Sequence, residues 1–240
     1  WQLASDMVIS GSILLSSGIL DVTAANYSVT FSGDWNNTGA VFLPRAGIVQ
    51  WDGRTYETRT LASGGQSFYD LVVNPTGDFS VLEMRDPLTV DHNLVITSPL
   101  GAGWASGLDT NMVSDYDLTV QGDLIIGGSG NVGRLWANDS LVRLYGSFLA
   151  ASSQWEIATG TITFCASSGT HIITSAGGTF ENLMFDDGGG GAVWQLTDSL
   201  TAEGNLTIMS GTLDVDMSDL TVGGTFSNEG NLQVEGSEDL

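Results

Sequence analysis

Lysine is absent from this chain of 240 residues, and its six basic residues are all arginine. Against 28 acidic residues they leave a formal net charge of −22. A chain this acidic has few cations to neutralise phosphate groups, so we expect it to bind neither nucleic acid nor an anionic membrane surface. The missing lysine also excludes Schiff-base chemistry and phosphate-binding P-loops. Divalent cations, sugars and other proteins are the partners that this charge permits.

Cysteine and histidine are scarce, and long apolar runs do not occur. The single cysteine, Cys165, excludes an intrachain disulfide and a cysteine-rich metal site. It aligns with Asp52 in the repeat described below, so we interpret it as a structural thiol. Two histidines and the lack of a Gly-x-Ser-x-Gly motif favour a protein that is not an enzyme. Since no run of about 20 apolar residues is present, we expect no membrane insertion.

What the chain contains instead is internal repetition. Segment 194–215 repeats segment 1–22 at a constant offset of 193 residues, and a third copy begins at Leu82. The middle copy carries extra residues near 100–140. Because the sequence begins and ends inside the repeat, we expect one continuous repeat domain that is a segment of a longer polypeptide. Its three units are 1–81, 82–193 and an incomplete 194–240.

A shorter period of about 20 residues runs inside each unit. Leu200, Leu220 and Leu240 share this spacing, and the apolar runs alternate with the period of two that is typical of strands. The pattern predicts an all-β chain whose short strands stack as a β-solenoid, a parallel β-helix-like fold. About 12 coils at the usual strand spacing would form a rod on the order of 55–60 Å long. Tandem immunoglobulin-like β-sandwiches are the alternative, since a long repeat would suit them too.

Positions that align between the units should share one structural role. We expect a continuous core to contain Leu3, Met84, Leu196, Ile13, Leu94, Leu206, Leu15, Ile96 and Ile208. Five tryptophans that fall at pattern positions should join this core: Trp1, Trp35, Trp51, Trp155 and Trp194. Four glycines just after apolar runs should lie at corners, several with positive φ: Gly33, Gly122, Gly146 and Gly224.

Carboxylates are the one chemical resource in surplus. Residues two apart in a strand share a face, and oxygen pairs of this kind can bind Ca²⁺. The candidate ligands are Asp214, Asp216 and Asp219 in one group and Asp115 with Asp117 in another. The first unit has Thr23 where Asp216 stands, which favours solvated turn acids over a repeated calcium site. Structural Ca²⁺ is therefore the one cofactor that we consider.

Two further kinds of candidate site follow from residue type. Trp104 and Trp136 lie in the insertion, outside the repeat, so they are the tryptophans that we expect to stack on a sugar. Four asparagines match the N-glycosylation motif, which would make the chain a glycoprotein in an extracytoplasmic compartment. They are Asn26, Asn36, Asn138 and Asn205.

The C-terminal third carries a resemblance to a known group of proteins. Gly204-Asn-Leu-Thr-Ile and Gly211-Thr-Leu-Asp-Val, followed by Leu220-Thr-Val-Gly-Gly-Thr-Phe, resemble the strand repeats of very large secreted or cell-surface proteins of bacteria and archaea. Adhesin-like proteins and autotransporter-passenger-like stalks belong to this broad group. The resemblance covers essentially the whole chain, least well at 100–140. It implies an extracellular structural or adhesive role, often in a sheath, stalk or filament.

Three functions follow from these observations. The leading hypothesis is a non-catalytic structural building block of a cell-surface layer, sheath or extracellular filament. Its partners would be further coils of the same protein, other subunits, or glycans. A carbohydrate-binding or adhesive module is the alternative. A polysaccharide lyase or hydrolase on a β-helix is the second alternative, although no arginine lies near an aspartate cluster in more than one unit.

Overall fold

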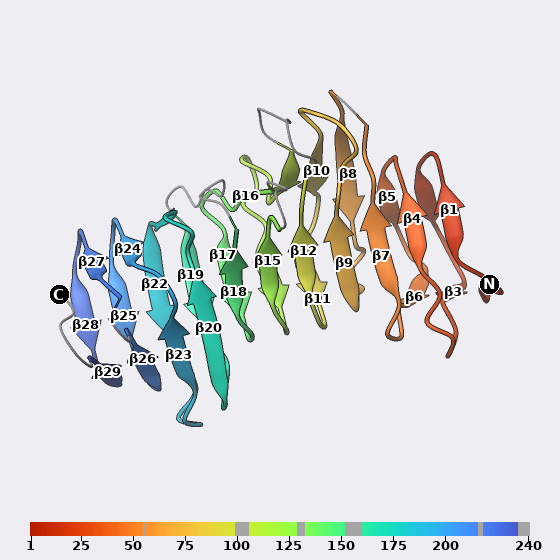
Figure 1. The fold of residues 1–240 in the computed structure, drawn as a ribbon. Helices are drawn as coiled ribbons and strands as arrows, with labels where there is room; N and C mark the ends of the chain where they lie inside the picture. Colours follow the sequence, from red (N-terminus) through yellow and green to blue (C-terminus); the bar gives the residue numbers. More distant parts are fainter. Residues whose placement is uncertain (55, 99–105, 129–132, 152–159, 216–217, 235–240) are drawn as a thin grey trace.

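The chain forms a β-solenoid, as the alternation of apolar residues predicts (Figure 1). The computed structural model describes residues 1–54, 56–98, 106–128, 133–151, 160–215 and 218–234. These ranges contain 29 strands and no helix. Strands pair in parallel with the strand one coil earlier and one coil later. The immunoglobulin-like alternative is therefore wrong, because such sandwiches consist of antiparallel sheets.

Three faces run along the solenoid, and the described strands of successive coils lie on them in the same order. The first face is one eleven-stranded sheet: β1 (Met7–Ile9), β4 (Val29–Phe31), β7 (Ile48–Trp51), β9 (Asp70–Val73), β12 (Leu94–Ile96), β15 (Leu124–Ile126), β18 (Phe148–Ala150), β20 (Thr170–Thr174), β23 (Val193–Leu196), β26 (Thr212–Asp214) and β29 (Asn231–Gln233). The second face begins with a six-stranded sheet: β2 (Ile13–Leu15), β5 (Trp35–Asn37), β8 (Thr58–Ala62), β10 (Val81–Met84), β13 (Gly107–Asp109) and β16 (Arg134–Trp136).

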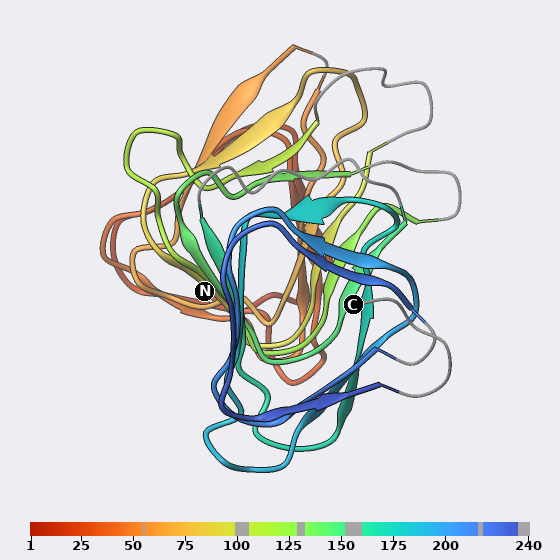
Figure 2. The ribbon, with the colours of Figure 1, turned by 90° about the vertical axis from the view of Figure 1, so that its left-hand side faces the viewer.

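The second face continues in a three-stranded sheet: β21 (Thr179–Phe180), β24 (Leu200–Ala202) and β27 (Leu220–Val222). The third face begins with a pair of strands, β3 (Ile19–Asp21) and β6 (Val41–Leu43). A seven-stranded sheet completes it: β11 (Leu88–Val90), β14 (Leu118–Val120), β17 (Leu141–Leu144), β19 (Thr161–Phe164), β22 (Asn182–Phe185), β25 (Leu206–Ile208) and β28 (Phe226–Asn228). Figure 2 shows the coils nearly end-on, wrapped around a shared interior.

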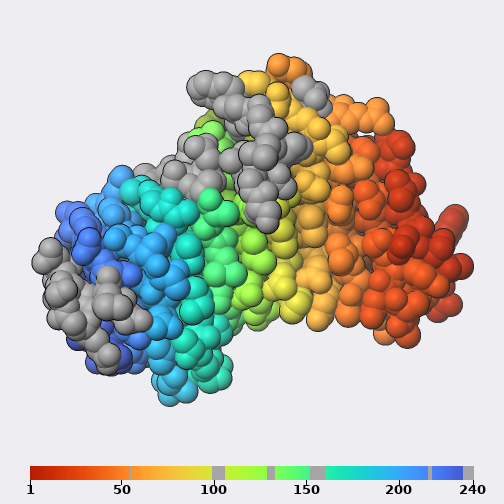
Figure 3. All heavy atoms as spheres, in the orientation of Figure 1, coloured from red at the N-terminus to blue at the C-terminus, as the bar shows by residue number. Residues whose placement is uncertain are grey.

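The coils are longer and fewer than the sequence predicts. Paired residues on the first face are separated by 19 residues at Trp194 and Leu213, but by 30 at Leu94 and Leu124. Eleven strands spaced by ~4.8 Å give this face a length of about 48 Å. The prediction of about 12 coils is wrong, because corner loops of different length make several coils longer than the basic repeat, whereas the strands keep their alternation. In Figure 3 the coils follow one another along the rod in chain order.

The predicted core is confirmed. Seven of the nine aligned residues are buried, and the other two, Leu3 and Leu15 of the first coil, are half-buried and pack against the core. The copies of one repeat position nevertheless lie on different faces. Ile13 is in β2 on the second face, Leu94 in β12 on the first and Leu206 in β25 on the third. The repeat is thus a repeat of strands rather than of whole coils.

Aromatic side chains fill two regions of the core. Trp35 contacts Phe42 and Phe68, with ring centroids 5.0 and 5.2 Å apart. Phe185 packs between Phe164, at 4.9 Å, and Trp194, at 5.2 Å. Trp35, Trp51 and Trp194 are buried as predicted.

Two of the five predicted core tryptophans have a different outcome. Trp1 is 95% exposed, so its placement in the core is wrong. It lies at the open end of the first coil, where no further coil packs on it in this structure. Trp155 lies outside the described residues.

The four predicted corner glycines lie at bends before strands, but the expected positive φ is wrong for all four. They are glycine because successive corners stack closely. A Cβ on Gly146 would lie 2.4 Å from the backbone of Gly122, and one on Gly224 would lie 2.6 Å from the carbonyl oxygen of Gly204. The Gly224 N–H donates to that same carbonyl oxygen at 2.8 Å. Close approach of two backbones, rather than an unusual dihedral angle, selects glycine here.

Candidate functional site

Trp136 lies on the second face at the end of β16, where its side chain is half-buried. The guanidinium carbon of Arg134 lies 5.2 Å from the centroid of its ring, which is a cation–π distance. Burial lowers the pKa of the Arg134 guanidinium. The ring of Trp136, which we predicted to stack on a sugar, is therefore in contact with the Arg134 side chain. The second predicted residue, Trp104, lies outside the described residues.

Two carboxylates lie in register with Trp136 along the second face. Glu83 pairs with Asp109 on the neighbouring strand, and Asp109 pairs with Trp136. Each carboxylate accepts a hydrogen bond from an asparagine amide of the following coil: Asn111 donates to Glu83 at 2.6 Å and Asn138 to Asp109 at 2.7 Å. Both carboxylates are therefore engaged in hydrogen bonds that link neighbouring coils.

The predicted calcium ligands Asp115 and Asp117 lie in the loop before β14 and are both half-buried. The Asp115 carboxylate accepts the backbone N–H of Asp139 at 3.2 Å. Asp117 accepts the backbone N–H of Leu141 at 3.3 Å and forms an ion pair with Arg143 at 3.2 Å. Both side chains thus link their loop to the next coil.

The second predicted calcium group is only partly described. Asp214 is half-buried at the end of β26, Asp219 is exposed just before β27, and Asp216 lies outside the described residues. Among the residues that the structure describes, no three His, Cys, Asp or Glu side chains come close enough together to hold a metal ion.

Three of the four predicted glycosylation sites are exposed. Asn26 lies in the corner after β3, Asn36 points outward from β5, and Asn205 lies in the bend before β25. Asn138 is half-buried, and its amide nitrogen, the atom that a glycan would modify, donates to Asp109. Asn26, Asn36 and Asn205 are therefore the accessible acceptors.

Aspartate has a structural role that the sequence reasoning missed. The Asp86 carboxylate accepts the backbone N–H groups of Ser63 at 2.8 Å and Gly64 at 2.6 Å, one coil earlier. Asp198 accepts those of Ser175 and Ala176 at the same two distances. The signal was visible, because Asp86 and Asp198 align at the 112-residue offset of the repeat.

Polar side chains at one corner form a continuous ladder along the solenoid. An Asp70 carboxylate oxygen accepts the backbone N–H of Asn93 at 3.0 Å, and the Asn93 side-chain oxygen accepts that of Asp123 at 2.8 Å. Asp123 accepts from Ser147 at 2.7 Å, and the Ser147 hydroxyl accepts from Ile172 at 3.0 Å. Each side chain satisfies a backbone donor that the corner leaves unpaired, as buried donors require.

Other carboxylates also accept backbone N–H groups, Asp6 and Asp34 from the next coil and the rest from their own corner. Backbone N–H groups donate to Asp6, Asp21, Asp34, Asp109, Asp186 and Asp187. Hydrogen bonds from the Ser210 hydroxyl, and then from the backbone of Gly189, Gly191 and Ala192, lower the pKa of Asp187 to about 2. Asp6, Asp34, Asp186 and Asp187 lie between strands, whereas Asp21 and Asp109 end strands β3 and β13. Asp21 and Asp187 are buried, so the interpretation as solvated turn acids does not hold for these two.

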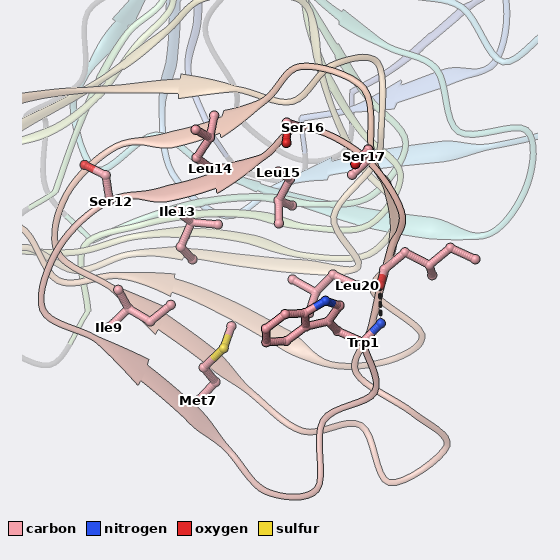
Figure 4. Close-up of a pocket in the computed structure, with 12 residues that line it drawn as sticks. Trp1, Met7, Ile9, Ser12, Ile13, Leu14, Leu15, Ser16, Ser17 and Leu20 are labelled. Atoms are coloured by element: carbon pink, nitrogen blue, oxygen red, sulfur yellow. Dashed lines mark hydrogen bonds between the residues drawn. The ribbon is translucent and has the colours of Figure 1, made fainter.

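The two ends of the solenoid expose apolar side chains. At the first coil an open cavity of about 340 Å³ is lined by the inward-facing side chains of β1 and β2, including Met7, Ile9 and Ile13 (Figure 4). The N-terminal amine beside it donates to the carbonyl oxygen of Ile19 at 2.6 Å. At the other end, a cavity of about 210 Å³ is lined by Leu220, Val222, Phe226 and Leu232.

Comparisons of the chain with protein families, with curated proteins and with solved structures give no match. In the part of the chain that the structure describes, no helix is long and apolar enough to cross a membrane. The function proposed below therefore rests on the geometry of the chain itself.

Proposed function

We propose that the chain is a non-catalytic structural building block of a cell-surface layer, sheath or extracellular filament. The observation that supports this proposal is the use of its polar side chains. The carboxylates of Asp86, Asp198 and Asp123 accept backbone N–H groups of a neighbouring coil. Asp6, Asp34 and Asp70 make the same kind of contact. They hold the coils in register instead of converging on a site for a substrate.

The mechanism of such a building block would be mechanical. Parallel backbone ladders run along all three faces, and one core of buried side chains joins every coil. Each coil contacts mainly its two neighbours, so the stack can be extended without altering what is already built. The open ladder edges and apolar cavities at both ends are suited to further coils, either of the same polypeptide or of another subunit.

Antibody labelling of the source organism would test the extracellular location. An antibody against residues 1–240 should label intact cells, and the protein should be enriched in material sheared from their surface. An antibody against a cytoplasmic protein serves as the control, since it should label only permeabilised cells. Labelling by both antibodies only after permeabilisation would contradict the proposal.

A carbohydrate-binding or adhesive module is the second candidate, and aromatic side chains on the second face and its edge favour it. Trp136 with Arg134 is one such group, and a more exposed one is described below. The hydrolase or lyase alternative has no comparable support, because Glu83 and Asp109 are engaged by asparagine amides. Incubation with polysaccharides and detection of new reducing or unsaturated ends would test it.

A further inference from the structure

We propose that the corner between the first and second faces, at the loops β7–β8 and β9–β10, binds a neutral glycan on the rings of Tyr56 and Phe79. Thr58 pairs with Val81, so these two aromatic residues occupy equivalent positions in consecutive coils. Their ring centroids are 5.1 Å apart and their planes differ by 11°. Tyr56 is 75% exposed and Phe79 is 39% exposed. The pair presents aromatic surface to solvent and adds little to the core.

Both residues hold a backbone conformation that bulky side chains avoid. Their φ angles are +60° for Tyr56 and +54° for Phe79, in the left-handed region. The two loops are tied together, because the Tyr56 N–H donates to the carbonyl oxygen of Asp78 at 2.8 Å and the buried Ser80 hydroxyl donates to that of Arg54. Strain at two exposed aromatic residues in successive coils serves no packing purpose, which points to a function for the rings.

A polar depression lies beside Tyr56 in the chain, because Arg54 and Glu57 of the same loop and Arg59 of β8 help to line it. Its volume is about 100 Å³, and the rest of its lining consists of three serines and two glycines from the first two coils: Ser10, Gly11, Ser12, Ser32 and Gly33. These polar groups can hydrogen-bond to the hydroxyls at the edge of a sugar whose ring lies on the aromatic pair.

The charges around the depression favour an uncharged ligand. Arg59 forms an ion pair with Glu57, with Nε and Oε2 3.0 Å apart, and also interacts with the Asp34 carboxylate, so Glu57 and Asp34 balance the charges of Arg54 and Arg59. The chain as a whole carries −22 and repels polyanions. An apolar ring surface beside a pocket of mixed donors and acceptors matches a neutral sugar, which has an apolar C–H face and hydroxyl edges.

Affinity electrophoresis of residues 1–240 through gels that contain soluble neutral polysaccharides would test the proposal. We would use a β-glucan, a mannan and a xyloglucan, with polygalacturonate as the anionic control. At least one neutral polysaccharide should retard the protein, and polygalacturonate should not. The double variant Tyr56→Gly/Phe79→Gly should weaken binding at least tenfold and keep its melting temperature, because glycine accepts positive φ.

Two further variants keep the test independent of folding. Arg54→Gln changes the depression without altering a strained residue and should weaken binding by about threefold or more. Met112→Ala removes an apolar side chain that is 77% exposed on a different loop, and it should bind as the wild type does. The proposal is wrong if no neutral polysaccharide retards the protein, or if the glycine and Arg54 variants bind unchanged. It is also wrong if the glycine variant only reduces self-association, since the rings would then be a protein contact.

Discussion

At the scale of single residues, the identity of a corner residue depends on the coil beneath it. Gly122 and Gly146 stack so closely that a Cβ on the second would overlap the backbone of the first. Gly11, in the first coil, has no atom within 4 Å of the position of an added Cβ. Glycine is therefore required at position 146 but can be replaced at position 11, although both residues lie at corners.

This contrast predicts different effects of alanine. Gly146→Ala should lower the free energy of unfolding by about 1–3 kcal/mol, as overpacking does in general. Gly11→Ala should change it by less than about 0.5 kcal/mol, as surface substitutions do. Urea unfolding followed by circular dichroism would measure both. Equal effects of the two substitutions would refute the close-stacking explanation.

A second prediction at this scale concerns acid. The pKa of Asp187 is lowered from 3.8 to about 2 in the folded chain, so its ionised form contributes stability that is present above about pH 4. This contribution is lost as the pH falls towards about 2. The range from about pH 5 to about pH 2 covers both pKa values. Over this range the melting temperature of Asp187→Asn should therefore fall less than that of the wild type. A non-titrating variant, Thr221→Ala, should keep the slope of the wild type, and an unchanged slope in Asp187→Asn would contradict the assignment.

At the scale of elements, each strand is short and depends on its neighbours for stability. β25 consists of only Leu206, Thr207 and Ile208, with the two apolar residues fully buried. It pairs with β22 on one side and β28 on the other. Removing one inward side chain should therefore affect three coils at once.

We accordingly expect Leu206→Ala to lower the free energy of unfolding by roughly 2–5 kcal/mol, the usual range for a large-to-small change in a core. Thr221→Ala, on the outer side of β27, is the matched control and should change it by less than about 0.5 kcal/mol. Chemical denaturation of both variants would measure the difference. If Leu206→Ala lowers the free energy of unfolding by less than about 1 kcal/mol, which is small for a core substitution, β25 is not part of a cooperative core.

At the scale of the whole molecule, apolar side chains are exposed at both ends of the rod. Phe226 is 44% exposed at the last coil, beside Leu220, Val222 and Leu232. At the first coil, Leu14 is 67% exposed and Val8 is 73% exposed. Open parallel edges beside such surfaces are prone to pair with other strands.

Residues 1–240 as a separate chain should therefore self-associate through their ends. Sedimentation velocity should show a rise in mass with concentration, and Phe226→Lys should shift this rise to at least tenfold higher concentration. Met112→Lys, which places the same charge on a lateral loop, should not. A wild-type chain that is monomeric at every concentration would refute end-to-end stacking.

Divalent cations should influence the same equilibrium. Copies that each carry −22 repel one another, and Ca²⁺ bound between acidic surfaces would reduce this repulsion. EDTA should therefore lower the sedimenting mass, and added CaCl₂ should restore it, whereas NaCl of equal ionic strength should restore it less. Identical effects of the two salts would indicate general screening rather than a calcium contact.

The sequence by itself determined the class of the fold and the residues of its core. Alternation with a period of two is a local property, so it identifies inward positions such as Leu94 and Leu206 without knowledge of their neighbours. It also indicated that Asp115 and Asp117 lie in a loop between strands. The repeat of Asp86 at Asp198 carried further information, because the two carboxylates make the same contacts.

Only the tertiary structure decided how the strands are arranged and which polar groups meet. The number of residues per coil, the face on which each repeat copy lies and the stacking of Tyr56 on Phe79 depend on contacts between residues 19 to 30 apart. Corner loops set those separations, and their lengths follow no fixed period. The residue at a corner depends on its contacts with the neighbouring coil. Glycine is needed where two backbones approach closely, and aspartate where the neighbouring coil has an unpaired N–H group. Both contacts exist only in the stacked coils, so the sequence alone does not reveal them.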